Sequence, residues 1–443
     1  MRSGIETSLY IHIPFCAGGK CDYCDFYSVP FNDGDSRPGR FIEKLLLEAE
    51  QVLNSFRPAR VPTLYIGGGT PSSLGSAGIL RLLRGLSGLI GRFSPPPEEI
   101  TLEVNPESAD EAFLAAAREG GATRLSLGIQ SFYGPSRRAV HRNPPPGWAG
   151  FPPGLGMEPG ADETFLRGRL ALAAAYFSAA FSADLMSGLP LQNKSILLDD
   201  VAALLSYRPA HVSLYALTLE PGTPLALKAA SSSAASFSAT PSFLPGRDEA
   251  DDLWLCGRDA LEKSGYGQYE VSNFCLAGKE SRHNVRYWRM QNWLALGPAA
   301  SGTIIDDATG TGFRYTVPPD VDAWLEMPPE LLSAAITGRR SGGRAYACFP
   351  ITEELDSPTL IKESFLMGFR YTEGPDEDLF HRRFHREILD LIPKTKSVWR
   401  ERGLLRKDKA ALTKEGLLFL DPFLLDAFQE LDSSRSELDS SRQ

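Results

Sequence analysis

Three cysteines near the start of the chain are the residues whose type and spacing best suit chemistry. Cys16, Cys21 and Cys24 lie within one short segment, and thiolates are soft ligands that hold zinc or iron–sulfur clusters. A structural zinc site is closed by four ligands, and Asp25 adjoins Cys24 too closely to be an easy fourth. Three thiolates favour a [4Fe-4S] cluster, which then keeps one iron open for a small molecule. Zinc is the alternative.

The segments around and after these cysteines alternate between apolar runs and amphipathic stretches, which is the pattern of strand–helix repeats. Several runs are almost continuously apolar or β-branched, as in strands buried on both faces. Six repeats predict an α/β fold whose parallel sheet closes, or partly closes, into a barrel. The expected strands are residues 8–13, 63–66, 99–104, 124–129, 181–186 and 211–217, and the clearest helices are residues 41–53, 79–89 and 110–118.

Polar and glycine-rich positions follow the expected strands, where parallel folds gather their chemistry. The cysteine segment follows the first strand, and a glycine run at residues 67–71 follows the second. Glu103 ends the third strand, Gln130 ends the fourth and Asp184 lies in the fifth. We therefore expect these residues to share one rim of the barrel. Taken alone, the glycine run is at least as typical of an ordinary tight turn as of a binding site. Taken alone, Glu103 is typical of a solvated strand end.

Composition narrows the classes of function. The chain of 443 residues carries a net charge of −9 with a pI near 5.4, so it lacks the overall basic surface that favours nucleic acid as a partner. No apolar run is long enough to span a membrane, and the first residues do not form a signal-peptide core. Six cysteines are too few for a disulfide scaffold. We expect a cytoplasmic protein in which Cys256, Cys275 and Cys348 are small buried apolar residues.

Two domains and a tail are expected. The core domain covers residues 1–247, a second domain covers residues 248–428, and residues 429–443 form a flexible tail. Residues 143–163 are rich in proline and glycine and residues 229–246 in serine and alanine, so both are expected to be surface insertions. The second domain is expected to have helices at residues 353–367, 376–389, 394–402 and 413–428, with a small hairpin at residues 403–412.

The cysteine segment and several later runs resemble one known superfamily. Residues 10–26 (YIHIPFCAGGKCDYCDF) look like the opening of the radical S-adenosylmethionine (SAM) proteins and, within them, of the oxygen-independent coproporphyrinogen III oxidase group. The likeness continues through residues 65–72 (YIGGGTPS), 103–107 (EVNPE), 124–132 (RLSLGIQSF), 184–190 (DLMSGLP) and 219–224 (LEPGTP). It implies a partial (β/α)6 TIM-like radical SAM barrel, followed by a smaller helical HemN-type domain with a winged-helix-like β wing.

This resemblance implies the cofactors and the residues that hold them. In the superfamily, the amino and carboxylate groups of SAM chelate the open iron, and reduction of the cluster cleaves the sulfonium to a 5′-deoxyadenosyl radical. A [4Fe-4S] cluster on Cys16, Cys21 and Cys24, bound SAM and a reductant for the cluster are therefore implied, without an assigned catalytic residue. Glycines would let the backbone approach the ligand closely. The implied SAM contacts are Tyr10, Tyr23, Gly68, Gly69, Thr70, Glu103, Gln130, Arg142, Asp184 and Ala216.

Two departures from the family pattern concern the cysteine loop. The family has three residues between its first two cysteines, whereas residues 17–20 make four here. The extra residue falls in a Gly-Gly stretch, where the backbone can bulge at small cost. The family also has a glycine before Arg142 and a histidine two residues after it, where this chain has His141 and Pro144. This chain therefore departs from the family pattern on both sides of Arg142.

Two features favour heme handling over oxidase chemistry. Oxidases of this group carry a further cysteine two residues after the third cluster ligand, where this chain has Phe26. Residues 283–288 (HNVRYW) follow residues 269–274 (YEVSNF), and both resemble heme chaperones of the HemW type, whose HNxxYW motif is associated with heme binding. The resemblance therefore implies a chaperone that transfers heme to an acceptor protein. Coproporphyrinogen III oxidase is the alternative, and a related radical SAM methyltransferase is the third possibility.

His283 is the candidate ligand of the heme iron, because an imidazole is a good axial ligand and aromatic neighbours can pack on a porphyrin. The alternative is a structural histidine in a hydrogen-bond network with its Asn, Tyr and Trp neighbours. His12, His211, His381 and His385 have weaker claims. The acceptor protein and the oligomeric state are left open, and any contact with a membrane would be peripheral and made through the acceptor.

Overall fold

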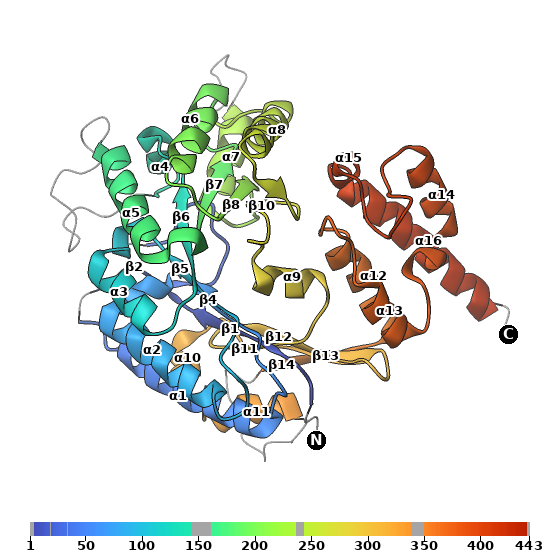
Figure 1. Ribbon diagram of the computed structural model, residues 1–443, viewed down its shortest axis with the longest axis horizontal. Coiled ribbons are helices and arrows are strands. Elements are labelled where there is room, and N and C mark those ends of the chain that lie inside the picture. The colour runs from blue at the N-terminus through green and yellow to red at the C-terminus, as the bar shows by residue number, and fades with distance from the viewer. Residues whose placement is uncertain are drawn as a thin grey trace.

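The computed structural model describes residues 4–17, 19–32, 34–142, 161–235, 243–337 and 350–440. Six parallel strands lie side by side at its centre (Figure 1). In spatial order they are β1 (Ser8–Ile13), β4 (Thr63–Gly68), β5 (Glu99–Val104), β6 (Arg124–Gln130), β7 (Phe181–Ser187) and β8 (His211–Ala216). Each expected strand is found to within two residues at either end, and the expected α/β barrel-type fold is confirmed.

Amphipathic helices cover the outer face of these strands (Figure 1). In α1 the buried residues Leu45, Ala49 and Val52 recur at spacings of four and three, so one apolar stripe faces the sheet. The main hydrophobic core lies between this stripe and strand residues such as Leu64 and Leu102. The helices are α1 (Arg37–Phe56), α2 (Gly75–Ile90), α3 (Glu111–Glu119), α4 (Gly134–Ala139), α5 (Ala161–Phe177), α6 (Lys194–Leu205), α7 (Pro224–Ala235) and α8 (Arg247–Lys263), with short 3-10 turns η1 (Pro71–Leu74), η2 (Pro106–Ser108) and η3 (Ser178–Ala180).

Short strands from the second half of the chain extend the sheet at both edges. Next to β8 lie β10 (Asn273–Cys275) and β9 (Gly267–Gln268), both antiparallel to their neighbours. Next to β1 lies parallel β11 (Trp293–Leu296), followed by antiparallel β12 (Ser301–Asp306), β13 (Thr311–Thr316) and β14 (Ile351–Leu355). The expected domain boundary at residue 248 stays a proposal. The sheet extends across this boundary, because strands before and after residue 248 pair with one another. A separate pair of strands, β2 (Phe15–Ala17) and β3 (Val29–Phe31), carries Cys16.

Three further helices pack around this sheet. They are α9 (Arg282–Trp288), α10 (Val321–Glu326) and α11 (Glu330–Thr337). Helix α9 lies between the six parallel strands and the C-terminal helices (Figure 1), where Val285 and Trp288 pack against Tyr269, Cys275 and Tyr371. The residues that resemble the HNxxYW motif therefore join the barrel to the last part of the chain.

The C-terminal helices have a hydrophobic core of their own, built on residues such as Phe365, Trp399 and Phe423. The wing expected at residues 403–412 is limited to one antiparallel bridge between Leu405 and Leu412. The helices are α12 (Ser357–Gly368), α13 (Glu377–Phe384), α14 (Pro393–Glu401), α15 (Lys414–Leu417) and α16 (Leu420–Ser440), with η4 (Ile388–Leu391).

Three details differ from the expectations. The helix expected from residue 353 begins at Ser357, because Asp356 caps it by accepting from the Thr359 amide, and the preceding residues form β14. Residues 229–235 of the second expected insertion are helical, as their alanine content favours. The expected tail is helical to Ser440, and near its start Glu430 accepts from the amides at the beginning of α14. Residues 143–160 and 236–242 of the insertions lie outside the described residues.

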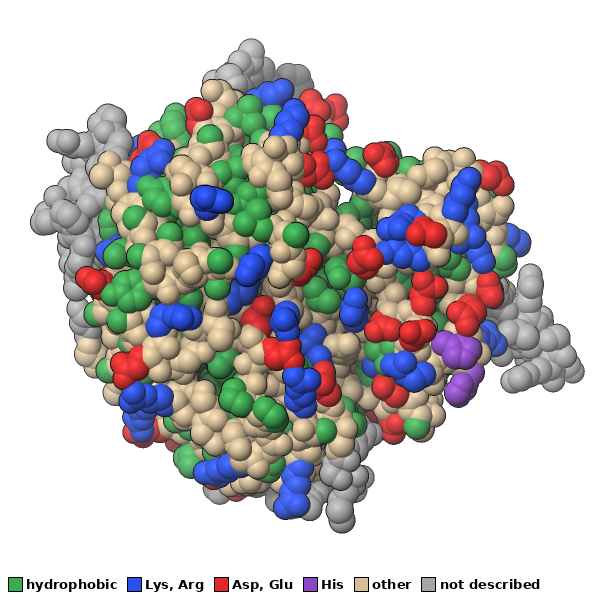
Figure 2. Space-filling view, viewed as in Figure 1, with side chains coloured by type: hydrophobic (Ala, Val, Ile, Leu, Met, Phe, Trp, Pro, Cys, Tyr) green, Lys and Arg blue, Asp and Glu red, His purple; other side chains and the backbone are tan. Residues whose placement is uncertain are grey.

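The described surface fits the composition. Figure 2 shows acidic and basic side chains interspersed over the face in view, rather than a broad basic patch. Within the described ranges, none of the helices combines the length and the apolar character that a membrane crossing requires.

Candidate functional site

The cysteine loop begins where β1 ends, at the C-terminal rim of the parallel strands. Cys16 lies in β2, and its Sγ is 3.5 Å from Oγ1 of Thr70. Cys21 and Cys24 share one turn, in which the Cys24 amide donates to the Cys21 carbonyl over 3.1 Å. Tyr23 lies between them, and burial, together with nearby Cys21, raises the pKa of its hydroxyl.

The glycine run at the end of β4 lies against the strands that lead to Cys16. A Cβ at Gly68, whose φ is 110°, would come within 2.9 Å of the His12 ring. A Cβ at Gly69 would come within 2.6 Å of the Phe15 carbonyl oxygen, and the Thr70 amide donates to that same carbonyl over 2.7 Å. The absence of side chains here allows the turn to approach the cysteine loop. Contact of these glycines with SAM stays a proposal.

Arg142 links the second cysteine to the neighbouring strands. Its Nη1 donates to Sγ of Cys21 over 3.5 Å, and its Nη2 donates to Oδ1 of Asn105 over 2.9 Å and to the Gly128 carbonyl over 2.7 Å. Asn105 donates in turn to Oγ1 of Thr70 over 3.0 Å. Because Thr70 also contacts Cys16, one path of polar contacts runs from Cys16 to Cys21.

Asn105 is a site residue that the sequence reasoning missed. It lies within the run at residues 103–107, two positions after Glu103, and that position just beyond the end of β5 was the available signal. Gly67 was missed as well, since a Cβ there would come within 2.7 Å of Oε2 of Glu103.

The three cysteines suit a cluster by their chemistry, but the described side chains do not form a closed set of ligands. Within the described ranges, which omit residue 18 between Cys16 and Cys21, no three Cys, His, Asp or Glu side chains form a group that could hold a metal ion. The donors are all soft sulfurs on one loop, as a three-thiolate cluster requires. The ligand assignment of Cys16, Cys21 and Cys24 stays a proposal.

Glu103 lies inside the barrel next to the glycine run. The Tyr65 hydroxyl donates to its Oε1 over 2.6 Å, and the Gly68 amide donates to its Oε2 over 3.2 Å. Burial raises the pKa of Glu103 to about 7, with a contribution from the carboxylate of Asp184, while the two hydrogen bonds oppose the shift. Its carboxyl group can therefore gain or lose a proton near neutral pH.

Two buried polar atoms of side chains that lie beside Gly128 of β6 lack a hydrogen-bond partner among the described residues. They are Oε1 of Gln130 and Nε of Arg142. Gln130 has a φ of 68°, a left-handed conformation that is uncommon for glutamine. An amide oxygen accepts hydrogen bonds and a guanidinium donates them, so the two atoms complement an ammonium and a carboxylate. These residues fit the amino-acid end of SAM.

The remaining expected SAM contacts lie on three other strands of the barrel. Tyr10 on β1 has its hydroxyl 3.1 Å from Nδ1 of His12, and burial raises its pKa well above the usual value. Asp184 on β7 accepts from the Ser126 hydroxyl over 3.4 Å, and burial raises its pKa. Ala216 ends β8 beside Ser187, at the same rim.

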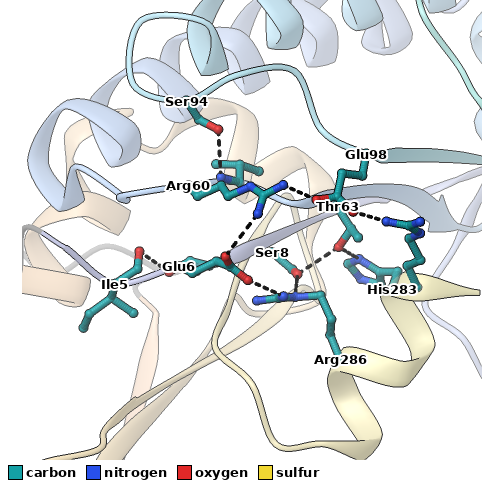
Figure 3. A network of polar contacts seen from close by, with 12 residues as sticks. Ile5, Glu6, Ser8, Arg60, Thr63, Ser94, Glu98, His283 and Arg286 are labelled. Carbon is teal, nitrogen blue, oxygen red and sulfur yellow. Dashed lines mark hydrogen bonds and ion pairs between the residues drawn. The ribbon is translucent and has the colours of Figure 1, made fainter.

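His283 lies at the opposite end of the barrel from the cysteines. Its Nδ1 is 2.8 Å from Oγ1 of Thr63, the first residue of β4, and its Nε2 is 3.0 Å from the Tyr287 hydroxyl. The backbone amide of His283 donates to Glu99, the first residue of β5. Figure 3 shows Arg286 of the same helix reaching Ser8, the first residue of β1, and Glu6. Helix α9 thus closes the N-terminal end of the barrel.

These contacts support the structural interpretation of His283. Its side chain is buried, and both ring nitrogens have partners in the protein. Burial, with Arg286 and Arg124 nearby, lowers the pKa of His283 to about 3. The sequence indicated a hydrogen bond between His283 and Tyr287 as the structural alternative, but it did not indicate the contact with Thr63. An iron ligand would need a ring nitrogen that is both free and reachable, which this arrangement does not offer.

A second histidine, His141, lies at the cysteine rim. Its Nδ1 is 2.6 Å from Oδ1 of Asp22, a carboxylate between Cys21 and Cys24 that also accepts from Lys228. The side chain of His141 is 68% exposed and that of Asp22 only 6% exposed. From the sequence, His141 was only a departure from the family pattern, since its partner Asp22 lies 119 residues earlier in the chain.

Residues 10–149 match the Radical SAM superfamily. With the six parallel strands and the three-cysteine loop at their C-terminal rim, this makes the chain a radical SAM protein.

Two relatives and one solved structure refine this class. The chain is 31% identical to the Radical S-adenosyl methionine domain-containing protein 1, mitochondrial, of Bos taurus, over 97% of this chain and 89% of the relative. It is 32% identical to the Heme chaperone HemW of Escherichia coli (strain K12), over 67% of this chain and 70% of the relative. The structure of coproporphyrinogen III oxidase (HemN) from Escherichia coli superposes with a TM-score of 0.70 at 20% identity, over 96% of this chain and 90% of that one, which supports the fold. The chain belongs to the HemW family of radical SAM proteins.

Membership in the radical SAM superfamily implies a [4Fe-4S] cluster and SAM as cofactors. The donor set of the cysteine loop and the unpartnered atoms of Gln130 and Arg142 agree with both groups.

Proposed function

We propose that this protein is a heme chaperone that binds heme, a [4Fe-4S] cluster and SAM, and transfers the heme to an acceptor protein. The observation that carries the proposal is Phe26, which stands where oxidases of this group have a cysteine. Its side chain is 64% exposed beside the cysteine loop. The names of relatives such as the Escherichia coli Heme chaperone HemW support the same function.

The site residues divide into three roles under this proposal. Cys16, Cys21 and Cys24 hold the cluster, whose open iron would bind the amino and carboxylate groups of SAM. Arg142 orients the loop through Cys21 and offers its unpartnered Nε to the SAM carboxylate. The remaining residues line the SAM pocket: Tyr10, Tyr23, Gly68, Gly69, Thr70, Glu103, Gln130, Asp184 and Ala216.

Exposed apolar side chains at the cysteine rim support heme as the cargo. Phe26, Leu191, Leu219 and Leu227 follow barrel strands on this side, and they are 64%, 55%, 42% and 63% exposed. Large apolar residues that remain exposed together on one side of a protein often mark a binding surface. A porphyrin ring has the flat apolar faces that such residues cover.

The test is anaerobic reconstitution of the cluster, followed by separate assays for heme binding and for oxidase activity. We expect one heme per chain, heme transfer to an acceptor apoprotein, and no protoporphyrinogen from coproporphyrinogen III with SAM and reductant. A Cys21→Ser variant, which should lose the cluster, serves as the control. Formation of protoporphyrinogen would replace the proposal with the oxidase, and failure to bind heme would refute it.

A further inference from the structure

Every histidine of the chain lies in a described region, so the candidates for a heme ligand can be compared one by one. The chain has six histidines. Three are buried, His12 and His211 on barrel strands and His283 on the helix that closes the N-terminal end, and both ring nitrogens of each have partners. The ring nitrogens of His12 are within hydrogen-bond distance of the Tyr10 hydroxyl and the Tyr27 carbonyl. Those of His211 contact the hydroxyls of Ser182 and Tyr269, and those of His283 contact the hydroxyls of Thr63 and Tyr287. None of these three imidazoles is free to reach an iron.

The other three histidines are accessible, but only one lies at the cysteine rim. His381 and His385 belong to helix α13 and its C-terminal cap, among the C-terminal helices. His141 follows α4, and Val140 beside it accepts from the Asp22 amide over 3.0 Å. His141 is therefore next to the loop that carries Cys21 and Cys24.

The contact with Asp22 prepares His141 as a ligand. Asp22 accepts from both His141 and Lys228, as an ionised carboxylate does. Because Nδ1 is the ring nitrogen that contacts Asp22, Nε2 is the ring nitrogen that would bind a metal. Metal-binding histidines commonly donate their other ring nitrogen to a carboxylate, which fixes the ring and increases its basicity.

The surroundings of His141 suit a porphyrin. Val140 packs with Met186, Leu189 and Leu225 in an apolar cluster. Phe26 follows Asp22 in the cysteine loop, and Leu227 precedes Lys228 on α7; both side chains are largely exposed. Lys228 is 48% exposed and adds a cation to which a propionate could bind. The candidate metal ligand His141 and the cation of Lys228 both contact the Asp22 carboxylate, and exposed apolar side chains lie near them in the sequence.

We propose that His141 is the protein ligand of the heme iron, with Asp22 as its positioning residue, and that heme binds at the cysteine rim of the barrel. This inference rests on the proposed heme-chaperone function. It moves the heme from the residues that resemble the HNxxYW motif to the end of the barrel where the cluster is expected.

The test is a hemin titration of the reconstituted full-length protein, read by optical and resonance Raman spectra, with iron and sulfide content measured in parallel. His141→Ala should lose the histidine-ligand signature and bind heme about tenfold more weakly or worse. Free imidazole should restore the signature. His381→Ala is the matched control, because His381 also pairs with a carboxylate, Glu387, over 2.8 Å and is 56% exposed. It should behave as the wild type.

The outcomes separate this inference from the proposed function. If the wild type binds no heme, both fail. If the wild type binds heme and His141→Ala keeps its affinity and its histidine signature, only the inference fails. If His141→Ala also loses the cluster, rescue by imidazole decides: a restored histidine-type spectrum supports the inference, and an unchanged one overturns it. Asp22→Asn should shift the iron–histidine vibration while heme stays bound, and an unshifted vibration would refute the positioning role.

Discussion

Lowering the pH should destabilise the protein through His283, and replacing this residue with glutamine should remove that part of the loss. In the folded chain, burial lowers the pKa of His283 to about 3, whereas an exposed imidazole in an unfolded chain has a pKa of about 6.5. Between these values the unfolded chain binds the proton and the folded chain does not. Stability at this site is therefore complete above about pH 6.5 and falls as the pH falls towards 3.

The two pKa values of His283, folded and unfolded, determine how much free energy of unfolding is lost. Between pH 7.5 and pH 5.0, protonation of the unfolded chain at this site costs the wild type about 2 kcal/mol. Glutamine takes up no proton, so the difference in free energy of unfolding between the wild type and His283→Gln should shrink by about 2 kcal/mol over that interval. Glu48, whose pKa burial raises to about 6, acts in the opposite direction. It is present in both proteins and cancels from the difference.

The assay is equilibrium urea unfolding of both proteins at the two pH values, followed by tryptophan fluorescence. Exposed His381, replaced with glutamine, controls for the loss of an imidazole, and this variant should stay within about 0.5 kcal/mol of the wild type at each pH. A difference between wild type and His283→Gln that does not change with pH would refute a buried, neutral imidazole. It would also reopen the question of whether this ring can reach an iron.

Three further predictions concern the SAM site and the cysteine loop. Tyr65→Phe removes the 2.6 Å hydrogen bond to Glu103. Because a hydrogen bond to a charged group contributes about 1.5–3 kcal/mol, this variant should bind SAM about tenfold to a hundredfold more weakly, measured by equilibrium dialysis. An unchanged dissociation constant would contradict the role of Glu103. Gly68→Ala places a Cβ within 2.9 Å of His12 and should lower both the melting temperature and the cluster content. The control is Gly75→Ala, because Gly75 also has a positive φ but would have nothing within 4 Å of its Cβ; this variant should lose only about 1 kcal/mol of unfolding free energy. Equal effects of the two substitutions would show that the close approach to His12 does not matter. Arg142→Lys keeps the charge, but a lysine cannot make all three contacts to Cys21, Asn105 and Gly128. This variant should therefore lose its cluster to a chelator faster than the wild type does. Arg138→Lys, at an exposed position, is the control and should lose its cluster at the wild-type rate.

The parallel strands could be predicted because several of them are almost continuously apolar or β-branched runs between amphipathic stretches, and that pattern is visible locally. Strands β9–β14 are short, and their place depends on partners far along the chain. Ser8 of β1, for example, pairs with Trp293 of β11. No local pattern contains that information, so the sequence predicted none of these strands, and their residues fell within the expected second domain rather than at the edges of the first sheet.

The candidate site divides in the same way. The cysteines, the glycine run and Glu103 could be proposed as site residues because residue type and strand-end position are both local. The partners of the two histidines were not: Thr63 lies 220 residues before His283, and Asp22 lies 119 residues before His141. Whether an imidazole is buried and bonded or exposed and available depends on such distant partners. The motif therefore drew attention to His283, and His141 was passed over.

The position of His283 still allows it to influence the SAM site without touching iron. Its ring packs on Tyr65 with the ring centroids 5.0 Å apart, and the Tyr65 hydroxyl bonds Glu103 beside the glycine run. A change at His283 can thus disturb Tyr65, then Glu103, and so weaken SAM binding from the far end of the barrel. A heme defect in a His283 variant would not identify an iron ligand, because a disturbed SAM site or a loosened barrel would produce the same loss. Restoration by free imidazole separates these cases, since added imidazole can replace a missing ligand but cannot restore the position of Glu103.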